Sequence, residues 1–271
     1  MSAIKNVLSI GGSDPSGGAG IQADLKTFAA NGVYGMAIIS ALTAQNTRGV
    51  KAIHCPDAGF VEAQIDCLFE DIQPAAVKIG MLANAAIIRR VAARLRHYRA
   101  PNIVVDPVML ASSGQRLLDP CAVEVLVHEL LPLARLYTPN LHEGASLLGT
   151  RPPNSRQEML TMAKQLQRLS HSPVLLKGGH LPGRDSPDVL IDGDGSSHWF
   201  IARRIAGEAK HGTGCTLSAA IAANLARDNT DLSRAVKNAK IYLCEALISA
   251  DQLKVGTGPG PLNHSIGFEI N

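Results

Sequence analysis

Short apolar runs alternate along this chain with longer stretches in which apolar residues recur at helical spacing. The short runs are rich in valine, isoleucine and leucine and contain few polar residues, which is typical of strands that are covered on both faces of a sheet. The expected strands are residues 7–10, 34–39, 76–79, 103–105, 136–138 and 174–177. The expected helices are residues 60–71, 85–99, 121–131 and 156–169.

Strands and helices in this order predict a mainly parallel sheet joined by right-handed crossovers. Two segments depart from the order: residues 49–54 are expected to form a small strand of a flap, and residues 189–200 a β-hairpin. The chain shows no linker, internal repeat or low-complexity segment, so residues 1–271 are expected to form one domain. Ligands of such sheets bind beyond the carboxyl ends of the strands, and functional residues are expected in the loops there.

Composition narrows the classes of function. Hydrophobic residues make up 46% of the 271 residues and charged residues 18%, as in ordinary soluble globular proteins. Aromatic residues are only 4% and the net charge is +3, which argues against a nucleic-acid-binding surface. No apolar run is long enough to span a membrane, and the N-terminus lacks the features of a signal peptide. The five cysteines form no Cys-x-x-Cys pair, so a cytoplasmic protein without disulfides or a zinc site is expected.

A glycine-rich segment, residues 11–20, lies between the first strand and a predicted helix. Its five glycines, Gly12 among them, would let the backbone approach a ligand closely and point N–H groups toward it. The alternative is a flexible strand–helix turn, but five glycines exceed what a turn requires. The segment is not a P-loop, because no Gly-Lys-Ser/Thr follows, and Asp14 and Pro15 make it a poor dinucleotide-binding fingerprint.

A second glycine-rich segment, residues 211–216, precedes an apolar run that favours a helix. Gly212, Thr213 and Gly214 would then lie at a helix N-terminus, where free N–H groups and the helix dipole favour an anion. Cys215 at that position is expected to have a lowered pKa and to provide a thiolate near neutral pH. The alternative is a helix cap with a buried, unreactive thiol.

Polar residues follow three further predicted strands. Asn140 and Glu143 could hold a magnesium–phosphate group through water, or they could form a capping box, which is the better interpretation if they are taken alone. Asp106 could organise a metal or phosphate, or belong to a turn before Pro107. Lys177 could reach a phosphate that the glycines behind it allow to come close, or it could be a solvated residue.

Two other residues are candidates for contact with a substrate ring. The carboxamide of Gln45 can both donate and accept, which suits a ring that carries an amine beside a ring nitrogen, although an isolated glutamine is more often a polar loop residue. Met81 follows a strand and could line a ligand site, or it could belong to the core.

In their order along the chain, these segments resemble the hydroxymethylpyrimidine/phosphomethylpyrimidine kinases of the ribokinase-like superfamily. The resemblance runs from about Val7 to Asn263. The motifs that carry it are Gly-Gly-Ser-Asp-Pro-Ser-Gly-Gly-Ala-Gly-Ile-Gln-Ala-Asp-Leu-Lys (11–26), Thr-Ala-Gln-Asn-Thr (43–47), Lys-Ile-Gly-Met-Leu (78–82), Val-Asp-Pro-Val-Met (105–109), Thr-Pro-Asn-Leu-His-Glu (138–143) and His-Gly-Thr-Gly-Cys-Thr-Leu-Ser (211–218).

The resemblance implies a ribokinase-like three-layer α/β/α sandwich with a mainly parallel central sheet and a small β flap, usually as a homodimer. It implies MgATP as phosphoryl donor and two successive phosphorylations, of 4-amino-5-hydroxymethyl-2-methylpyrimidine and of its monophosphate, in thiamine biosynthesis. The residues that it places at the pyrimidine are Gly12, Asp24, Gln45, Met81 and Val108. Those that it places at the phosphates and Mg²⁺ are Asp106, Asn140, Glu143 and Lys177, with Gly212, Thr213 and Gly214 as an anion hole.

In-line phosphoryl transfer asks for positioning and charge stabilisation more than for covalent chemistry. Cys215 is expected to take the proton of the attacking hydroxyl or to orient it. The resemblance to the superfamily implies this role, because many of its members carry an aspartate as base at the corresponding position. A pyridoxine/pyridoxal kinase is the nearest alternative, and a non-catalytic pyrimidine-binding regulator is a second. Two departures from the family pattern, at Ala209-Lys210 and Gly258-Pro259, concern the nucleotide loops.

Overall fold

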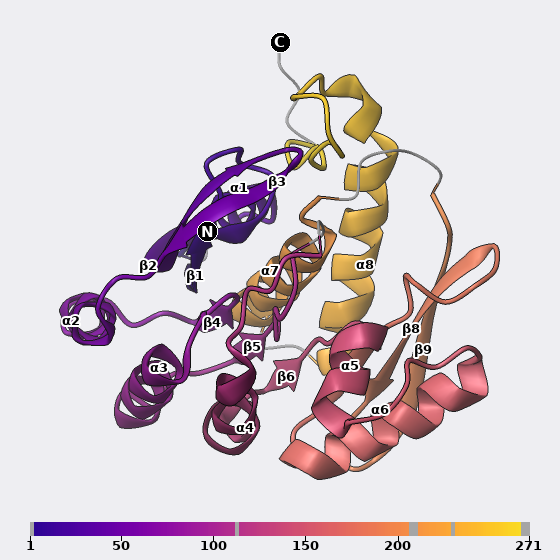
Figure 1. Cartoon of the computed structure of the whole chain (residues 1–271), viewed down its shortest axis with the longest axis horizontal. Helices are drawn as coiled ribbons and strands as arrows, with labels where there is room; N and C mark the ends of the chain where they lie inside the picture. Colours follow the sequence, from indigo (N-terminus) through magenta and orange to yellow (C-terminus); the bar gives the residue numbers. More distant parts are fainter. Residues whose placement is uncertain (1–2, 112–113, 206–210, 229–230, 267–271) are drawn as a thin grey trace.

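The computed structural model describes residues 3–111, 114–205, 211–228 and 231–266. At its centre is a sheet of nine strands in the order β3-β2-β1-β4-β5-β6-β7-β8-β9 (Figure 1). The strands are β1 (Asn6–Ser13), β2 (Tyr34–Asn46), β3 (Gly49–His54), β4 (Ala76–Ile79), β5 (Ile103–Val105), β6 (Leu136–Tyr137), β7 (Val174–Lys177), β8 (Asp185–Ile191) and β9 (Ser197–Arg203). The α-helices are α1 (Gly20–Ala30), α2 (Ala58–Phe69), α3 (Ala85–His97), α4 (Val123–Val125), α5 (Leu141–Leu148), α6 (Arg156–Ser170), α7 (Thr213–Asp228) and α8 (Leu232–Ile248).

The six central strands, β2, β1, β4, β5, β6 and β7, pair in parallel. At the two ends of the sheet, β3 pairs antiparallel with β2, β8 with β7, and β9 with β8. The mainly parallel sheet predicted from the sequence is therefore confirmed. The expected flap strand is β3, which pairs with the outer half of β2, and the expected hairpin is β8 with β9.

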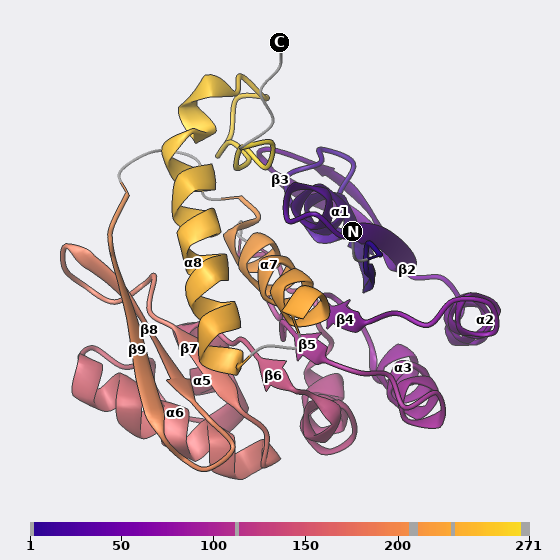
Figure 2. The same ribbon diagram turned by 180° about the vertical axis from the view of Figure 1, so that it is seen from behind.

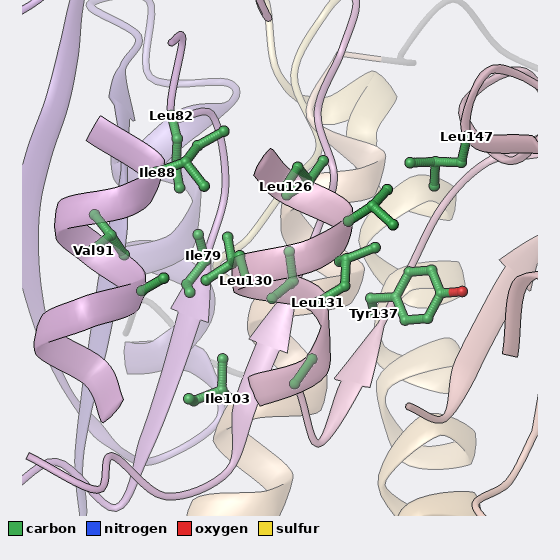
Figure 3. Close-up of a cluster of buried hydrophobic side chains, with 14 of the residues drawn as sticks. Ile79, Leu82, Ile88, Val91, Ile103, Leu126, Leu130, Leu131, Tyr137 and Leu147 are labelled. Atoms are coloured by element: carbon green, nitrogen blue, oxygen red, sulfur yellow. The ribbon is translucent and has the colours of Figure 1, made fainter. Parts of the chain in front are cut away.

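Helices cover both faces of the sheet (Figures 1 and 2). Along β1, Val7 packs with α7 and α8 on one face, whereas Leu8 and Ile10 pack with α2 and α3 on the other. On this second face, side chains from β4, β5, α3 and the segment after α4 meet in one buried cluster (Figure 3). Two apolar layers around a central sheet make the expected α/β/α sandwich.

Several predicted elements have other bounds in the structure, and two differ most. β2 does not end at residue 39 but continues to Asn46, because β3 supplies hydrogen-bonding partners for its polar outer half. The helix expected at residues 121–131 is broken into the 3₁₀ turn η1 (Pro120–Ala122), α4, the π-helical turn η2 (Leu126–Leu130) and the 3₁₀ turn η3 (Leu131–Leu133). Pro132 lacks the N–H that a continuing helix would use and its ring crowds the preceding turn, which accounts for the irregular end.

None of the helices in the described part of the chain combines the length and apolarity that crossing a bilayer requires.

Candidate active site

The predicted phosphate-binding residues meet beyond the carboxyl ends of β5, β6 and β7. Asp106, directly after β5, accepts hydrogen bonds through Oδ1 from Lys177 Nζ at 2.8 Å and from Thr138 Oγ1 at 3.2 Å. A Cβ atom on Gly214 would lie 3.2 Å from both Asp106 Oδ2 and Lys177 Nζ. The start of α7 therefore lies directly against this ion pair, and only a residue without a side chain fits there easily.

The charge of Lys177 is stabilised by neighbouring carboxylates. Burial lowers the pKa of Lys177, but Asp106 and Glu143 outweigh this effect and raise it above the ordinary value. A permanently charged ammonium beside the N-terminus of α7 makes this part of the site electropositive, which suits a phosphate.

Asn140 and Glu143 form the capping box that the sequence allowed as an alternative. Asn140 Oδ1 accepts from the N–H groups of His142 and Glu143, and Glu143 Oε2 accepts from Asn140 N at 2.7 Å. Burial raises the pKa of Glu143 to about 7, partly offset by Lys177. A cavity of about 100 Å³ opens beside both residues, with Met109 and Arg116 among its other lining residues.

The donor set fits a magnesium ion that brings most of its own ligands. In the part of the chain that the structure describes, no group of three or more His, Cys, Asp or Glu side chains could hold a metal ion. Asp106 is nonetheless close enough to Glu143 to raise the pKa of Glu143. Such a site suits Mg²⁺ that keeps waters and binds phosphate oxygens.

The two glycine-rich segments pack directly on each other. Gly212 has a φ of +87°, and a Cβ atom there would collide with the carbonyl oxygen of Gly18. A Cβ atom on Gly18 would in turn lie 2.5 Å from the ring of His211. Both segments therefore need glycine for close approach of backbone to backbone, in addition to any approach to a ligand.

Cys215 lies in the first turn of α7, as predicted, but its predicted low pKa is wrong. Burial raises the pKa of the Cys215 thiol to about 11, although the ammonium of Lys78 acts in the opposite direction. The helix N-terminus does not overcome this loss of solvation, so the sulfur carries its proton at neutral pH.

Asp24 is held inside the protein rather than on an open wall. Its Oδ2 accepts from Ser9 Oγ at 2.6 Å and from Lys78 Nζ at 2.8 Å, and all three residues are buried. Among the described residues its Oδ1 has no hydrogen-bond partner. Lys78 was not among the predicted site residues, although a lysine inside the apolar run Ala76-Val77-Lys78-Ile79 indicates a buried ion pair.

The other predicted pyrimidine-binding residues lie around the ends of β1, β2 and β4. A Cβ atom on Gly12 would lie 3.1 Å from the sulfur of Met81, so these two residues are in contact. Met81 is 7% exposed, and Val108 is half-buried. Gln45 is on β2, not in a loop, and its amide nitrogen lies 3.3 Å from His211 Nε2.

The C-terminal departure from the family pattern packs on the flap. Gly258 N donates to Thr47 Oγ1 at 3.2 Å, and a Cβ atom at Gly258 would collide with the carbonyl oxygen of Thr47. The other departure, Ala209-Lys210, lies outside the described residues.

Comparison with known proteins identifies the family of this chain. Residues 14–263 match the family model described as phosphomethylpyrimidine kinase. The hydroxymethylpyrimidine/phosphomethylpyrimidine kinase of Escherichia coli is 50% identical over 96% of this chain and 97% of its own length, and that of Rhizobium meliloti is 50% identical over 97% of each.

Solved structures give the same relationship. The phosphomethylpyrimidine kinase of Clostridium difficile is 42% identical, with a TM-score of 0.78 over 90% of this chain and 99% of that one. The pyridoxal kinase of Staphylococcus aureus in complex with AMP-PCP and pyridoxal is 33% identical, with a TM-score of 0.89 over 99% of this chain and 96% of that one. With a family model that covers most of its length and relatives at half identity, the chain belongs to the phosphomethylpyrimidine kinase family.

Proposed function

We propose that this protein transfers the γ-phosphoryl group of ATP to the hydroxymethyl oxygen of 4-amino-5-hydroxymethyl-2-methylpyrimidine, and then a second phosphoryl group to the resulting monophosphate, for thiamine biosynthesis. The observation that carries the proposal is the family match together with the cluster of Asp106, Lys177 and Gly214 at the start of α7. Structures of the Staphylococcus aureus pyridoxal kinase with ADP and with AMP-PCP support ATP as the donor.

In this proposal the N–H groups of Gly212, Thr213 and Gly214 face the transferring phosphoryl group. Charge develops on its oxygens in the transition state, and prearranged N–H donors stabilise that charge without reorganisation. Lys177 adds a positive charge on the other side of Gly214. The hydroxymethyl oxygen forms the new bond to phosphorus as the bridging P–O bond breaks and ADP leaves.

Mg²⁺ would be held by Asp106, Asn140 and Glu143 through water, and when bound it would neutralise charge on the phosphates. Glu143 keeps acceptor capacity beyond the bond that defines the cap. Both lone pairs of Asn140 Oδ1 are used in the cap, so its remaining contribution would come from its amide N–H groups, which suit a phosphate oxygen.

The thiolate form of Cys215 is assigned to accept the proton of the attacking hydroxyl. Because burial raises the pKa of this thiol, only a small thiolate fraction is present at neutral pH, and otherwise the proton passes to an oxygen of the transferred phosphoryl group or to solvent. The larger contribution of Cys215 is then to orient the hydroxyl, while the N–H groups and Lys177 stabilise charge.

The pyrimidine would lie among Gly12, Gln45, Met81 and Val108, with the buried Asp24 acting on it only through the residues that Asp24 holds in place. The carboxamide of Gln45 suits an aminopyrimidine, which offers an amine beside ring nitrogens.

Pyridoxal is the second candidate substrate, favoured by the high TM-score of a pyridoxal complex. A coupled kinase assay with hydroxymethylpyrimidine, its monophosphate and pyridoxal distinguishes the candidates. Turnover of the first two substrates well above that of pyridoxal is the expected result. Turnover of pyridoxal alone would reassign the substrate, and absence of ATP turnover with all three would favour a non-catalytic pyrimidine-binding regulator.

The remaining proposals concern the setting of the reaction. We propose that residues 1–271 form one kinase domain, that the protein acts in the cytoplasm without a nucleic-acid or membrane partner, and that it is a homodimer. The continuous sheet with an apolar layer on each face supports the single domain. Sedimentation velocity measures the oligomeric state directly.

A further inference from the structure

The glycine-rich segments on either side of the site are joined by one side-chain hydrogen bond that the family resemblance did not single out. His211 Nε2 lies 2.7 Å from Asp14 Oδ2, between side chains that are 12% and 3% exposed. The two residues are 197 positions apart in sequence, and they hold together the segment after β1 and the segment before α7.

The carboxylate of Asp14 accepts most of the side-chain hydrogen bonds that organise the first glycine-rich segment, residues 11–20. Its Oδ1 accepts from the backbone N and from the Oγ of Ser16, and its Oδ2 accepts from Ala19 N at 2.9 Å as well as from His211. Burial raises the pKa of Asp14, but the hydrogen bonds from His211 and Ser16 outweigh it and hold the pKa below its ordinary value. The carboxylate therefore fixes the backbone that leads into α1.

His211 has the corresponding role in the second segment. Its ring lies against Gly18, and its backbone N donates to Gly260 O at 3.3 Å, which ties in the C-terminal segment that packs on the flap. Gly212 follows directly and packs so closely on the first segment that an added Cβ atom would collide with the carbonyl oxygen of Gly18. The direction of the N–H groups at residues 212–214 thus depends on where His211 is held.

The same nitrogen of His211 also contacts the side-chain amide of Gln45. Nε2 of an imidazole carries at most one hydrogen, and the short contact to the Asp14 carboxylate takes it. The Gln45 amide nitrogen lies 3.3 Å from the same ring nitrogen. Gln45 Oε1 lies 3.1 Å from Thr43 Oγ1, whose single hydrogen also has Ser13 O within reach at 2.8 Å. His211 and Thr43 thus hold the carboxamide of Gln45 between them.

We propose that Asp14 and His211 form a positioning pair that sets two parts of the site at once: the N–H groups of residues 212–214, which face the transferring phosphoryl group, and the carboxamide of Gln45, which faces the pyrimidine. This inference rests on the proposed kinase function. Neither residue reacts with the substrates; each acts through the groups that it orients.

The test compares His211→Leu, which removes the hydrogen bond, with His211→Gln, whose amide can donate at a similar reach. Asp14→Asn weakens the same contact from the other side. We expect His211→Leu to lower kcat by about 10²-fold, because small displacements of positioned groups cost that much. The KM for hydroxymethylpyrimidine should rise while the KM for ATP stays unchanged, and His211→Gln should recover much of the loss.

Asp57→Ala is the matched control. Asp57 accepts from Gly59 N at 2.8 Å at the start of α2, so its loss also removes an aspartate–backbone bond before a helix, but away from the site. Thermal unfolding of all variants separates stability from activity. Normal kcat and KM in His211→Leu would overturn the proposal, as would an equal loss of kcat in Asp57→Ala at equal loss of stability, or no recovery in a folded His211→Gln.

A second measurement does not depend on turnover. Amide hydrogen exchange at residues 14–20 and 211–216 should accelerate in His211→Leu and in Asp14→Asn, but not in Asp57→Ala. Unchanged exchange at both segments would overturn the proposal even in a protein without kinase activity. Failure of wild-type protein to phosphorylate any substrate, with the exchange result as expected, would refute only the proposed function.

Discussion

Lys78 Nζ lies 2.8 Å from Asp24 Oδ2, and the two side chains are 1% and 0% exposed. The carboxylate thus has one oxygen that is fully engaged and, among the described residues, one that has no partner. Burial lowers the pKa of Lys78, but Asp24 and the nearby Cys215 and Asp106 raise it above the ordinary value. Burial also raises the pKa of Asp24, with Lys78 and Ser9 acting in the opposite direction, so the ammonium of Lys78 keeps its charge and is what stabilises the buried carboxylate.

Lys78→Met should lower the free energy of unfolding by about 3–5 kcal/mol, because it leaves a buried carboxylate without its counterion. Urea denaturation measures the loss. The double variant Lys78→Met/Asp24→Asn should lose less than the sum of the single variants. The exposed pair of Arg90 and Glu62 offers a control, since Arg90→Met should change stability much less. Additive losses would contradict a coupled pair.

Gln45→Leu should weaken pyrimidine binding by roughly 1–3 kcal/mol, the cost of losing hydrogen bonds in a largely buried polar site. The measurement is the KM for hydroxymethylpyrimidine, with the KM for ATP as internal reference. Asn46→Leu is the control, because it makes the same kind of change one residue along β2, where the side chain accepts from Arg48 N in the flap turn. An unchanged KM in Gln45→Leu would remove Gln45 from the pyrimidine site.

Cys215 should make catalysis depend on pH. With a pKa near 11, its thiolate fraction grows about tenfold for each pH unit between about pH 7 and 9. If that thiolate accepts the hydroxyl proton, kcat/KM rises over this range in the wild type and becomes flat in Cys215→Ala. Cys67→Ala, at an exposed cysteine, should leave the profile unchanged.

A flat wild-type profile would show that Cys215 only orients the hydroxyl. Thiol alkylation near neutral pH gives an independent check, since the exposed Cys67 and Cys121 should react before Cys215. Earlier modification of Cys215 would contradict the raised pKa.

Glu143→Gln separates the capping role of this residue from its role with Mg²⁺. Glutamine keeps an oxygen that can accept from Asn140 N, so stability should change little, but the lost charge should raise the Mg²⁺ concentration that half-maximal activity requires. Asn140→Ala removes the cap itself and should cost about 1 kcal/mol of stability. If Glu143→Gln showed normal Mg²⁺ dependence, the capping box would account for Glu143 completely.

His264 should make the fold less stable in mild acid. Burial, together with the nearby charge of Lys26, lowers the pKa of His264 to about 4 from an unfolded value near 6.5. The unfolded chain therefore binds more protons between these values, so stability is complete above about pH 6.5 and falls as the pH drops toward 4. At about pH 5 the loss should be roughly 2 kcal/mol.

Urea unfolding of wild type and His264→Asn at about pH 7 and 5 checks this prediction. The variant should lose stability at both values because the bond to Thr216 Oγ1 is weakened, but its stability should depend less on pH. Equal pH dependence in both proteins would assign the acid sensitivity to other groups.

The sequence predicted those parts of the fold that depend on local pattern. β4, β5 and β7 have the predicted bounds, because each is a short apolar run that is buried on both faces. The end of β2 depends on β3, and the broken helix around residues 120–133 depends on prolines at both of its ends, so apolar spacing alone gave the wrong bounds.

Contacts in the site could be predicted from the sequence only where the two partners are close together in the chain. The capping box of Asn140 and Glu143 is local and could be stated from the sequence. The partner of Asp24 is 54 residues away and that of Asp14 is 197 residues away, and no spacing rule connects them. The pKa of Cys215 was predicted in the wrong direction because helix position can be inferred from sequence, whereas burial by other segments cannot.

The packing of α7 and α8 on one face of the sheet has a consequence for how the protein is made. Val7 of β1, Ala76 of β4 and Val104 of β5 leave the ribosome well before these two helices, which provide much of the apolar layer that covers them. A nascent chain translated only through β9 would carry a sheet with one largely bare face, which favours aggregation or chaperone binding. Chains that terminate before α7 should therefore accumulate as insoluble material, and completion of translation is the event that permits release of a folded kinase.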